Sequence, residues 1–284
     1  MNAVETWLTW FFESQRPLDR ETMAAYRGHL SEKYKNTTAQ RLWSIAYRLL
    51  EEMVNNGYLP KNPARGLRGF KTGGGNYSKH VALTKEQVKI LLSVIPVEKE
   101  NGEPCLMGLR DRAIIILMLT TGLRRSECAI LKRGQLTMRG GHHVLLLREG
   151  ETKNDDAAMV KVIPWAWRSI EEFLQATGRT EIAPNAPLFV AFDRGDHPTE
   201  APISAKVIYK LVKKYAEQAE IEGLLPHGLR ASFITLALEA DAPLYKVMSD
   251  ARHAKPETTL RYHKRQKSLD RGSGDYVDWE SVQE

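Results

Sequence analysis

The 284-residue sequence contains only two cysteines, Cys105 and Cys128, and each stands among apolar neighbours. Two such cysteines do not make a disulfide framework, so we expect buried thiols in a reducing compartment. No apolar run reaches the ~18 residues that a membrane span requires. The first apolar stretch, residues 7–12, follows Glu5 rather than a basic leader, which argues against a secretory signal. The sequence therefore predicts a cytoplasmic protein with no membrane partner.

Acidic residues clustered at metal-ligand spacing are also lacking, so we expect neither a metal ion nor another cofactor. Hydrophobic residues make up 42% of the chain, which is enough for packed cores, and the length suits two domains. The net charge is +6, with a basic excess over residues 1–80 and an acidic excess over residues 271–284. This balance suits a polyanionic partner, although a solvated surface explains it about equally well.

Residues 1–70 carry the pattern of a small helical domain. Apolar residues recur at helical spacing over residues 2–14, and Asp19 is placed to cap a second helix. Asn36 or Thr37 is expected to cap a third helix, which should end before Gly57. Residues 71–80 contain three consecutive glycines and no apolar periodicity, so they are predicted to be a linker.

Residues 81–270 predict a second, larger domain. Thr84 and Gln87 form a capping box, and residues 107–120 are apolar enough to be a helix buried on most sides. Period-two patterns around residues 136–147 and 159–163 predict a three-stranded antiparallel sheet. Further helices are expected over residues 166–176 and 204–221, with a short strand near residues 188–192. The fold class is therefore mainly α (α+β), with residues 271–284 as a tail.

A set of polar residues in this second domain has the right types for chemistry on a phosphodiester. Two arginines can donate bidentate forks to a phosphate, and a tyrosine can attack phosphorus. Histidines can transfer protons, and a lysine can protonate a leaving 5′-hydroxyl. The candidate catalytic residues are Arg124, Lys153, His227, Arg230, His253 and Tyr262.

Basic side chains elsewhere are candidates for contacts with nucleic acid. The helix predicted over residues 204–221 has a lysine-rich face opposite an apolar face that includes Val207, Leu211 and Tyr215. A solvated lysine face is the alternative. The candidate DNA-contacting residues are Arg41, Lys206, Lys210, Lys213 and Arg252.

Four ordered motifs resemble those of the tyrosine recombinases, the phage integrase family. TGLRRSE at residues 121–127 resembles the first arginine motif, and GETKN at 150–154 resembles the hairpin-lysine motif. HGLR at 227–230 resembles the H-x-x-R box, and RHAKPETTLRY at 252–262 resembles the G-H-x-S-x-x-T-T-x-x-Y segment. The resemblance spans roughly residues 1–265 and implies a helical core-binding (SAM-like) domain followed by the family's catalytic domain.

The resemblance further implies site-specific recombination of double-stranded DNA through a 3′-phosphotyrosyl intermediate, without metal or ATP. Such an enzyme is a monomer in free solution and a tetramer on two DNA sites, and it works on the nucleoid, with an accessory protein as a further candidate partner. The tail over residues 271–284 is expected to dock on a neighbouring protomer, with disorder as the alternative.

This sequence departs from the family pattern at several positions. Arg252 stands where glycine is usual, and Ala254 replaces a common serine. The loop after Lys153 is longer than usual, so Lys161 is the fallback for the lysine role. Tyr245 and another tyrosine, Tyr276, lie outside the motif and are expected to be packing or tail residues.

Three alternatives remain open from the sequence. A type IB topoisomerase would use the same chemistry to relax DNA rather than to exchange strands. A relative that binds DNA but has lost catalysis is favoured only by Arg252. A helical protein-interaction module without DNA is disfavoured by the complete motif set.

Overall fold

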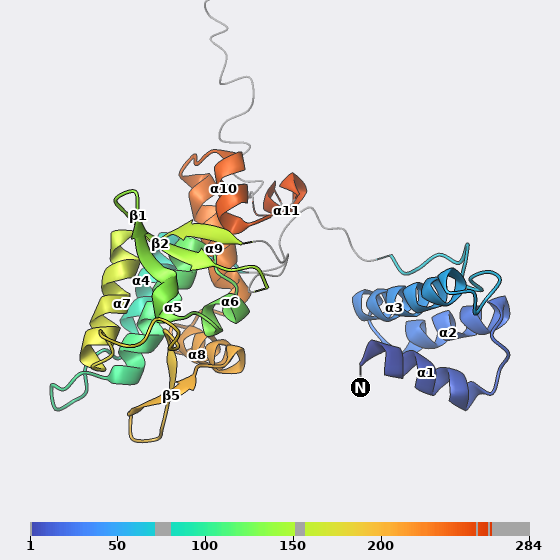
Figure 1. The fold of residues 1–284 in the computed structure, drawn as a ribbon, viewed down its shortest axis with the longest axis horizontal. Coiled ribbons are helices and arrows are strands. Elements are labelled where there is room, and N and C mark those ends of the chain that lie inside the picture. The colour runs from blue at the N-terminus through green and yellow to red at the C-terminus, as the bar shows by residue number, and fades with distance from the viewer. Residues whose placement is uncertain (1, 72–80, 151–156, 254, 261, 263–284) are drawn as a thin grey trace, which may run out of the picture. The chain divides into compact units, whose positions relative to one another are not determined.

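The computed structural model describes residues 2–71, 81–150, 157–253, 255–260 and 262. They fall into two compact units, Met1–Gly75 and Asn76–Glu284, and each unit has a hydrophobic core of its own (Figure 1). Among the described residues, every helix is too short or too polar to cross a membrane. As the sequence predicts, the fold is mainly helical with one small three-stranded sheet.

The first unit contains three helices, α1 (Ala3–Ser14), α2 (Arg20–Lys33) and α3 (Asn36–Asn55). The Asp19 carboxylate accepts a hydrogen bond from the Thr22 backbone at 2.8 Å, which confirms the predicted cap of α2. The expected cap of α3 is wrong, because Lys35 precedes this helix without a side-chain bond and Asn36 is already helical. The buried residues Trp7, Tyr26 and Leu42 belong to the core between the three helices.

The second unit is built around α5 (Leu106–Thr121). The side chains of residues 114–117 are fully buried, as the apolar sequence predicts, and α5 packs against α7 (Pro164–Ala176) and α9 (Pro226–Glu239). The capping box of Thr84 and Gln87 opens α4 (Lys85–Ser93) as expected. Helix α7 begins two residues earlier than predicted because Pro164 occupies its first position, where a missing N–H costs nothing.

The predicted three-stranded sheet is present and antiparallel. It consists of β1 (Leu136–Arg139), β2 (His142–Leu147) and β3 (Ala158–Lys161), in that order. Leu145 of β2 faces Leu136 on one side and Val160 on the other, and all three side chains are buried. A second antiparallel pair consists of β4 (Val190–Phe192) and β5 (Pro198–Pro202). Strand β5 was not predicted, because its two prolines argue against a strand in the sequence.

The two cysteines are both free, and only one of them is buried as predicted. Cys128 is buried, and burial raises the pKa of its thiol, whereas Cys105 is partly exposed. Cys105 immediately precedes α5, where the chain enters the core from a surface loop.

Helix α6 (Arg125–Ala129) follows the C-terminal end of α5 and packs against α8 (Ala205–Gln218). The 3-10 helix η1 (Arg133–Gln135) leads into β1. Helix α10 (Leu244–Ala251) packs against α9, and α11 (Pro256–Leu260) packs against α10. A small core of Ala231, Val247, Tyr262 and their neighbours joins these helices. The arrangement brings together the turn after α5, the start of α9 and the segment after α10.

Candidate active site

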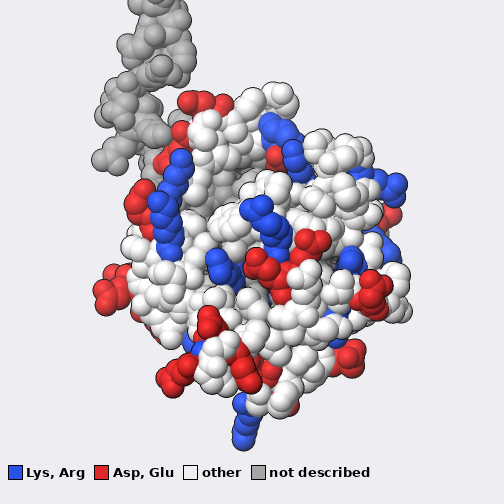
Figure 2. All heavy atoms as spheres, turned by 90° about the vertical axis from the view of Figure 1, so that its left-hand side faces the viewer, with Lys and Arg blue, Asp and Glu red and all other residues white. Residues whose placement is uncertain are grey.

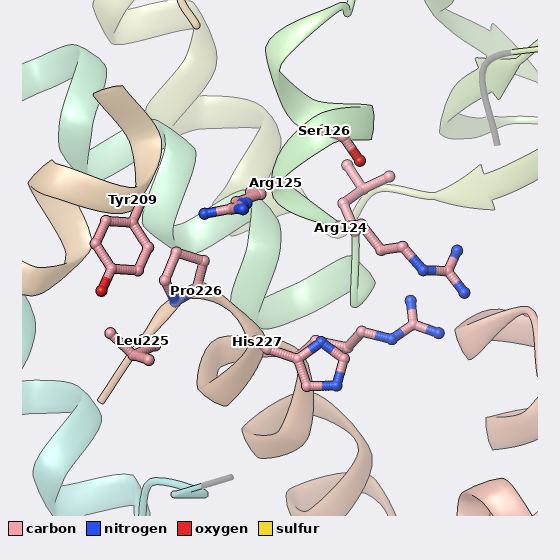
Figure 3. Close-up of a pocket in the computed structure, with 9 residues that line it drawn as sticks. Arg124, Arg125, Ser126, Tyr209, Leu225, Pro226 and His227 are labelled. Carbon is pink, nitrogen blue, oxygen red and sulfur yellow. The ribbon is translucent and has the colours of Figure 1, made fainter. Parts of the chain in front are cut away.

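Arg124 is positioned by the turn that ends α5. Gly122 adopts a left-handed conformation with φ 63°, which lets the chain leave the helix and begin α6 at once. The Arg124 backbone N–H donates to the Glu127 carboxylate at 2.8 Å, and its guanidinium donates to the same carboxylate at 2.6 Å. Arg124 and Arg125 point in opposite directions, and Arg125 lies 5.5 Å above the ring of Tyr209 (Figure 3).

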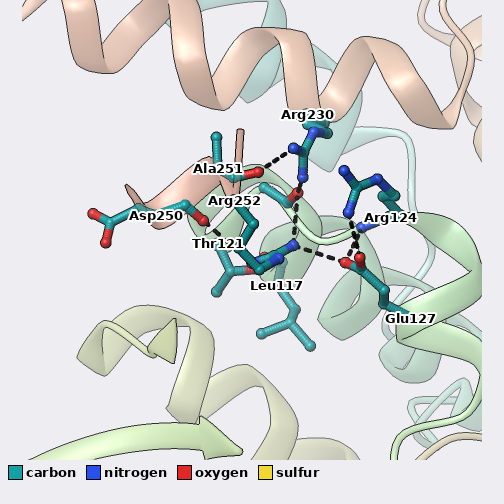
Figure 4. A network of polar contacts seen from close by, with 9 residues as sticks. Leu117, Thr121, Arg124, Glu127, Arg230, Asp250, Ala251 and Arg252 are labelled. Atoms are coloured by element: carbon teal, nitrogen blue, oxygen red, sulfur yellow. Dashed lines mark hydrogen bonds and ion pairs between the residues drawn. The ribbon is translucent and has the colours of Figure 1, made fainter. Parts of the chain in front are cut away.

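Arg230 lies in the first turns of α9 and is only 1% exposed. Its guanidinium donates hydrogen bonds to the carbonyls of Gly122 and Ala251 (Figure 4). These carbonyls belong to the C-terminal ends of α5 and α10, where helices leave acceptors unpaired and carry partial negative charge. Burial, and then the neighbouring Arg124 and Arg252, lowers the pKa of Arg230 to about 10.

The hydroxyl of Tyr262 lies 3.1 Å from Nε2 of His227. His227 is the second residue of α9, whereas Tyr262 follows α11, so the contact joins two separate motifs. Tyr262 is 8% exposed and packs in the small core between α9 and α10. This is the geometry expected of a nucleophile beside a proton acceptor.

His253 is positioned by the end of α10. Its backbone N–H donates to the Met248 carbonyl at 3.0 Å, and the preceding Arg252 N–H donates to Ser249 at 3.0 Å, which together form a Schellman motif. The Nδ1 atom of His253 lies 2.9 Å from the Thr259 hydroxyl, and its ring stacks on Tyr262 with centroids 6.0 Å apart. Burial, and then Arg230 and Arg124, lowers the pKa of His253 to about 4.

A pocket of about 330 Å³ opens beside these residues (Figure 3). Arg124, His227 and Arg230 line one part of it, and Tyr209 and Leu225 line another. None of the described residues that line it carries a carboxylate. A pocket with cationic donors and no acidic group suits an anion such as a phosphodiester.

Arg252 occupies the position where the family pattern has glycine. It adopts the left-handed conformation that glycine would favour, with φ 53°. Its guanidinium is directed inward and donates to the Glu127 carboxylate at 2.7 Å, with 11% of the side chain exposed. The DNA contact predicted for Arg252 stays a prediction.

Two residues that contact the site were not predicted. Glu127 is 1% exposed and accepts hydrogen bonds from Arg124 and Arg252. Its spacing of three residues from Arg124 is that of a capping box, which was a usable signal in the sequence. Thr259 contacts His253, and it is the second threonine of the T-T pair in the motif at residues 252–262, which was also a usable signal.

The two candidates for the lysine role differ in what the structure describes. Lys153 lies outside the described residues, and Lys161 is exposed on β3. Tyr276 also lies outside them, and Tyr245 is 75% exposed, so a packing role for Tyr245 is wrong.

The candidate DNA-contacting side chains outside the site are exposed. Arg41 is on α3, and Lys206, Lys210 and Lys213 are on α8. The predicted apolar face of α8 was partly wrong, because Val207 is 36% exposed and Ile208 is buried in its place. On the side of the molecule where α7 lies, basic and acidic side chains of the described residues are interspersed (Figure 2). That face does not present the single-sign field that attracts a polyanion.

Within the described ranges, no group of three or more His, Cys, Asp or Glu side chains is arranged to hold a metal ion. Besides Glu127 and Thr259, the polar groups gathered here are arginines, histidines and a tyrosine. Together they can bind a phosphate, attack it and move a proton.

Comparisons with known proteins identify the family of the chain. The profile of the phage integrase family matches residues 82–268. Tyrosine recombinase XerD of Lacticaseibacillus casei is 26% identical over 261 residues, which cover 90% of this chain and 83% of that protein. Tyrosine recombinase XerA of Pyrococcus furiosus is 31% identical over 188 residues, which cover 64% of this chain and 56% of that protein.

Solved structures share the fold. XerH site-specific recombinase bound to palindromic difH substrate, in a post-cleavage complex, matches with a TM-score of 0.72 and 19% identity over 98% of this chain and 77% of that chain. A lambda integrase dimer bound to a core site matches with a TM-score of 0.62 and 16% identity over 91% of this chain and 82% of that chain. Because the family profile covers more than half of the sequence, the chain belongs to the phage integrase family of tyrosine recombinases.

Proposed function

We propose that this chain cleaves and rejoins double-stranded DNA at specific sites, with Tyr262 as the nucleophile. The observation that carries the proposal is the 3.1 Å contact between the Tyr262 hydroxyl and Nε2 of His227, beside the arginines of the pocket. When the His227 ring carries its hydrogen on Nδ1, Nε2 accepts the hydrogen bond from the hydroxyl. It can then take the proton as the tyrosine attacks phosphorus.

The residues of this chain account for both proton transfers and for the bond that forms and the bond that breaks in the cleavage step. A bond forms between the Tyr262 oxygen and phosphorus, and the bond from phosphorus to the 5′ oxygen breaks. The phenolic proton passes to His227, and the departing oxygen takes a proton from Lys153, with Lys161 as the fallback. The product is a 3′-phosphotyrosyl ester and a free 5′-hydroxyl. Attack on that ester by the 5′-hydroxyl of a partner strand reverses the step and joins the exchanged strands.

The arginines and His253 stabilise the charge on the non-bridging phosphate oxygens. Arg124 and Arg230 can each donate to a phosphate in the pocket that they line. The lowered pKa of His253 keeps its imidazole neutral near pH 7, so that it acts as a hydrogen-bond donor. Since the phosphoester energy is retained in the tyrosyl ester, we propose that the reaction requires neither metal nor ATP.

The relatives support the choice of recombination over simple DNA relaxation, because those described above are named tyrosine recombinases. The XerH structure contains the DNA substrate of that protein, and we propose that duplex DNA is the partner here too. The first unit would serve as the core-binding domain and the second as the catalytic domain, with Arg41, Lys206, Lys210 and Lys213 toward DNA.

We propose that four protomers assemble on two DNA sites at the nucleoid. The tail over residues 271–284, which lies outside the described residues, would dock on a neighbouring protomer. Deletion of the tail should leave binding to one site intact and weaken assembly on two sites in native gels. Unchanged assembly would contradict this role.

A covalent-trapping assay tests the cleavage step. The full chain is incubated in EDTA with nicked suicide duplexes tiled across the DNA that flanks its gene, and the products are run on a denaturing gel. We expect a protein–DNA adduct that Tyr262→Phe abolishes while DNA binding in a gel shift persists. An adduct that survives Tyr262→Phe places the nucleophile elsewhere. Binding without any adduct favours a DNA-binding relative that has lost catalysis.

A further inference from the structure

We propose that Arg252 is a positioning residue that fixes Arg124 for catalysis through the carboxylate of Glu127. This inference rests on the proposed function, because Arg124 is taken there as a phosphate-binding arginine. It assigns a use to the most conspicuous departure of this chain from the motif pattern, the arginine in the place of glycine.

The backbone around Arg252 explains why a glycine is expected there. The Schellman motif that ends α10 needs one residue in the left-handed conformation, and Arg252 adopts it with φ 53° and ψ 50°. For a residue with a Cβ atom this conformation is unfavourable, which is why glycine is the usual choice. The arginine side chain offers an interaction that glycine cannot.

The interaction is an ion pair in the interior of the site (Figure 4). Glu127 accepts from Arg252 at its Oε2 atom at 2.7 Å and from the Arg124 guanidinium at its Oε1 atom at 2.6 Å. The carboxylate is 1% exposed, so a lost partner leaves part of a buried charge uncompensated. One carboxylate thus links the turn after α5 to the turn after α10.

The directions of the three arginines separate their roles. Arg124 and Arg230 line the pocket, whereas Arg252 is absent from its described lining. The Nη2 atom of Arg252 bonds Glu127, and its Nη1 atom bonds the Asp250 carbonyl at 3.2 Å. The hydrogen bonds of Arg252 go to Glu127, Asp250 and Gly122, so on this inference it acts on the phosphate through Glu127 and Arg124 rather than by contact.

The same link connects the position of His253 to that of Arg124. Arg252 precedes His253 directly. Ala251, the residue before Arg252, accepts a hydrogen bond from Arg230 at its carbonyl. If the bond between Arg252 and Glu127 is lost, the turn after α10 is no longer tied to the carboxylate that holds Arg124. Displacements of about 1 Å in a site that positions reacting groups cost up to about 100-fold in rate.

The test is a double-mutant cycle of Arg252→Gly and Glu127→Gln in the full chain. The readouts are the single-turnover cleavage rate at saturating protein and the affinity in a gel shift, both on the nicked duplex that wild type cleaves. We expect Arg252→Gly to slow cleavage by about tenfold or more while affinity changes by less than about threefold. In the Glu127→Gln background the same substitution should have little further effect, because the two residues act as one unit.

Three further variants keep the result interpretable. Arg252→Lys retains a charge beside Glu127 and should recover most of the cleavage rate. Lys246→Ala removes an exposed ion pair with Asp250 on the same helix, at 2.7 Å, and should match wild type. Should Arg252→Gly fail to fold, Arg252→Asn replaces it, since asparagine tolerates the left-handed conformation.

Each outcome decides the matter. Normal cleavage by Arg252→Gly overturns the inference and leaves the recombinase proposal intact. An equal loss of affinity and rate overturns it in favour of a direct DNA contact, and additive effects in the cycle exclude action through Glu127. If wild type forms no adduct with any duplex, the proposed function fails, and this inference fails with it.

Discussion

Acidification from pH 7 to pH 5 should destabilise the protein through His253. Burial and the neighbouring arginines lower the pKa of this imidazole to about 4 in the folded chain, against about 6.5 for an unfolded histidine. Between these values the unfolded chain binds more protons than the folded one. The free energy of unfolding therefore falls as the pH falls, and this contribution is complete only above about pH 6.5.

The size of the effect follows from the two pKa values. Linkage between about 4 and about 6.5 gives a loss of about 2 kcal/mol between pH 7 and pH 5. The His253 ring is only partly buried, and solvent screens the arginines that face it. We therefore expect about half of this value, or about 1 kcal/mol.

Two measurements check this prediction. A titration of the histidine ring carbons by NMR should give His253 a midpoint clearly below the 6.5 of an unfolded histidine. Urea unfolding at both pH values should show that His253→Gln loses about 1 kcal/mol less than wild type on acidification. The exposed His142 provides a matched control, since His142→Gln should behave as wild type. A His253 midpoint near pH 6.5, or the same loss in wild type and His253→Gln, would refute the reasoning.

Three further substitutions have expected outcomes. Thr259→Val removes the hydroxyl 2.9 Å from His253 and should slow single-turnover cleavage by about tenfold with little change in DNA affinity, because the ring is no longer oriented. Gly122→Ala should lower stability by about 1–3 kcal/mol in urea unfolding, since φ is 63° and an added Cβ would lie 2.7 Å from the Phe233 ring; unchanged stability would contradict this. Arg230→Lys should reduce covalent trapping by about 100-fold or more, because an ammonium cannot replace a fork that bonds two carbonyls and faces the pocket.

Local patterns predicted most of the helices. Thr84 and Gln87 marked the start of α4, and the apolar run within α5 identified its burial, because both signals lie within a few consecutive residues. Strand β5 was not predicted, since Pro198 and Pro202 are read as loop residues and their pairing with β4 is a tertiary effect. The predicted start of α3 was wrong although a local signal was present. Asn36 is a good capping residue, but it lies inside the helix and Lys35 takes the capping position.

The candidate site shows the same division. The resemblance identified Arg124, Arg230 and Tyr262 without showing what holds them. Glu127 bonds an arginine 125 positions later in the chain, and no local pattern could connect the two. The contact between His227 and Tyr262 likewise depends on how α9 and α11 are placed, which only the folded structure provides.

Arg230 and Tyr262 of the candidate catalytic set differ in what else depends on them. Arg230 fastens the ends of α5 and α10, so its replacement loosens the fold as well as the chemistry. The hydroxyl of Tyr262 contacts His227, whereas its ring packs in the small core and does not need the hydroxyl to do so. Relatives that bind DNA but no longer cleave it should therefore lose the tyrosine hydroxyl first and retain the arginine. An intact arginine motif in a distant relative is thus weak grounds for assigning activity, and the tyrosine is the residue to inspect.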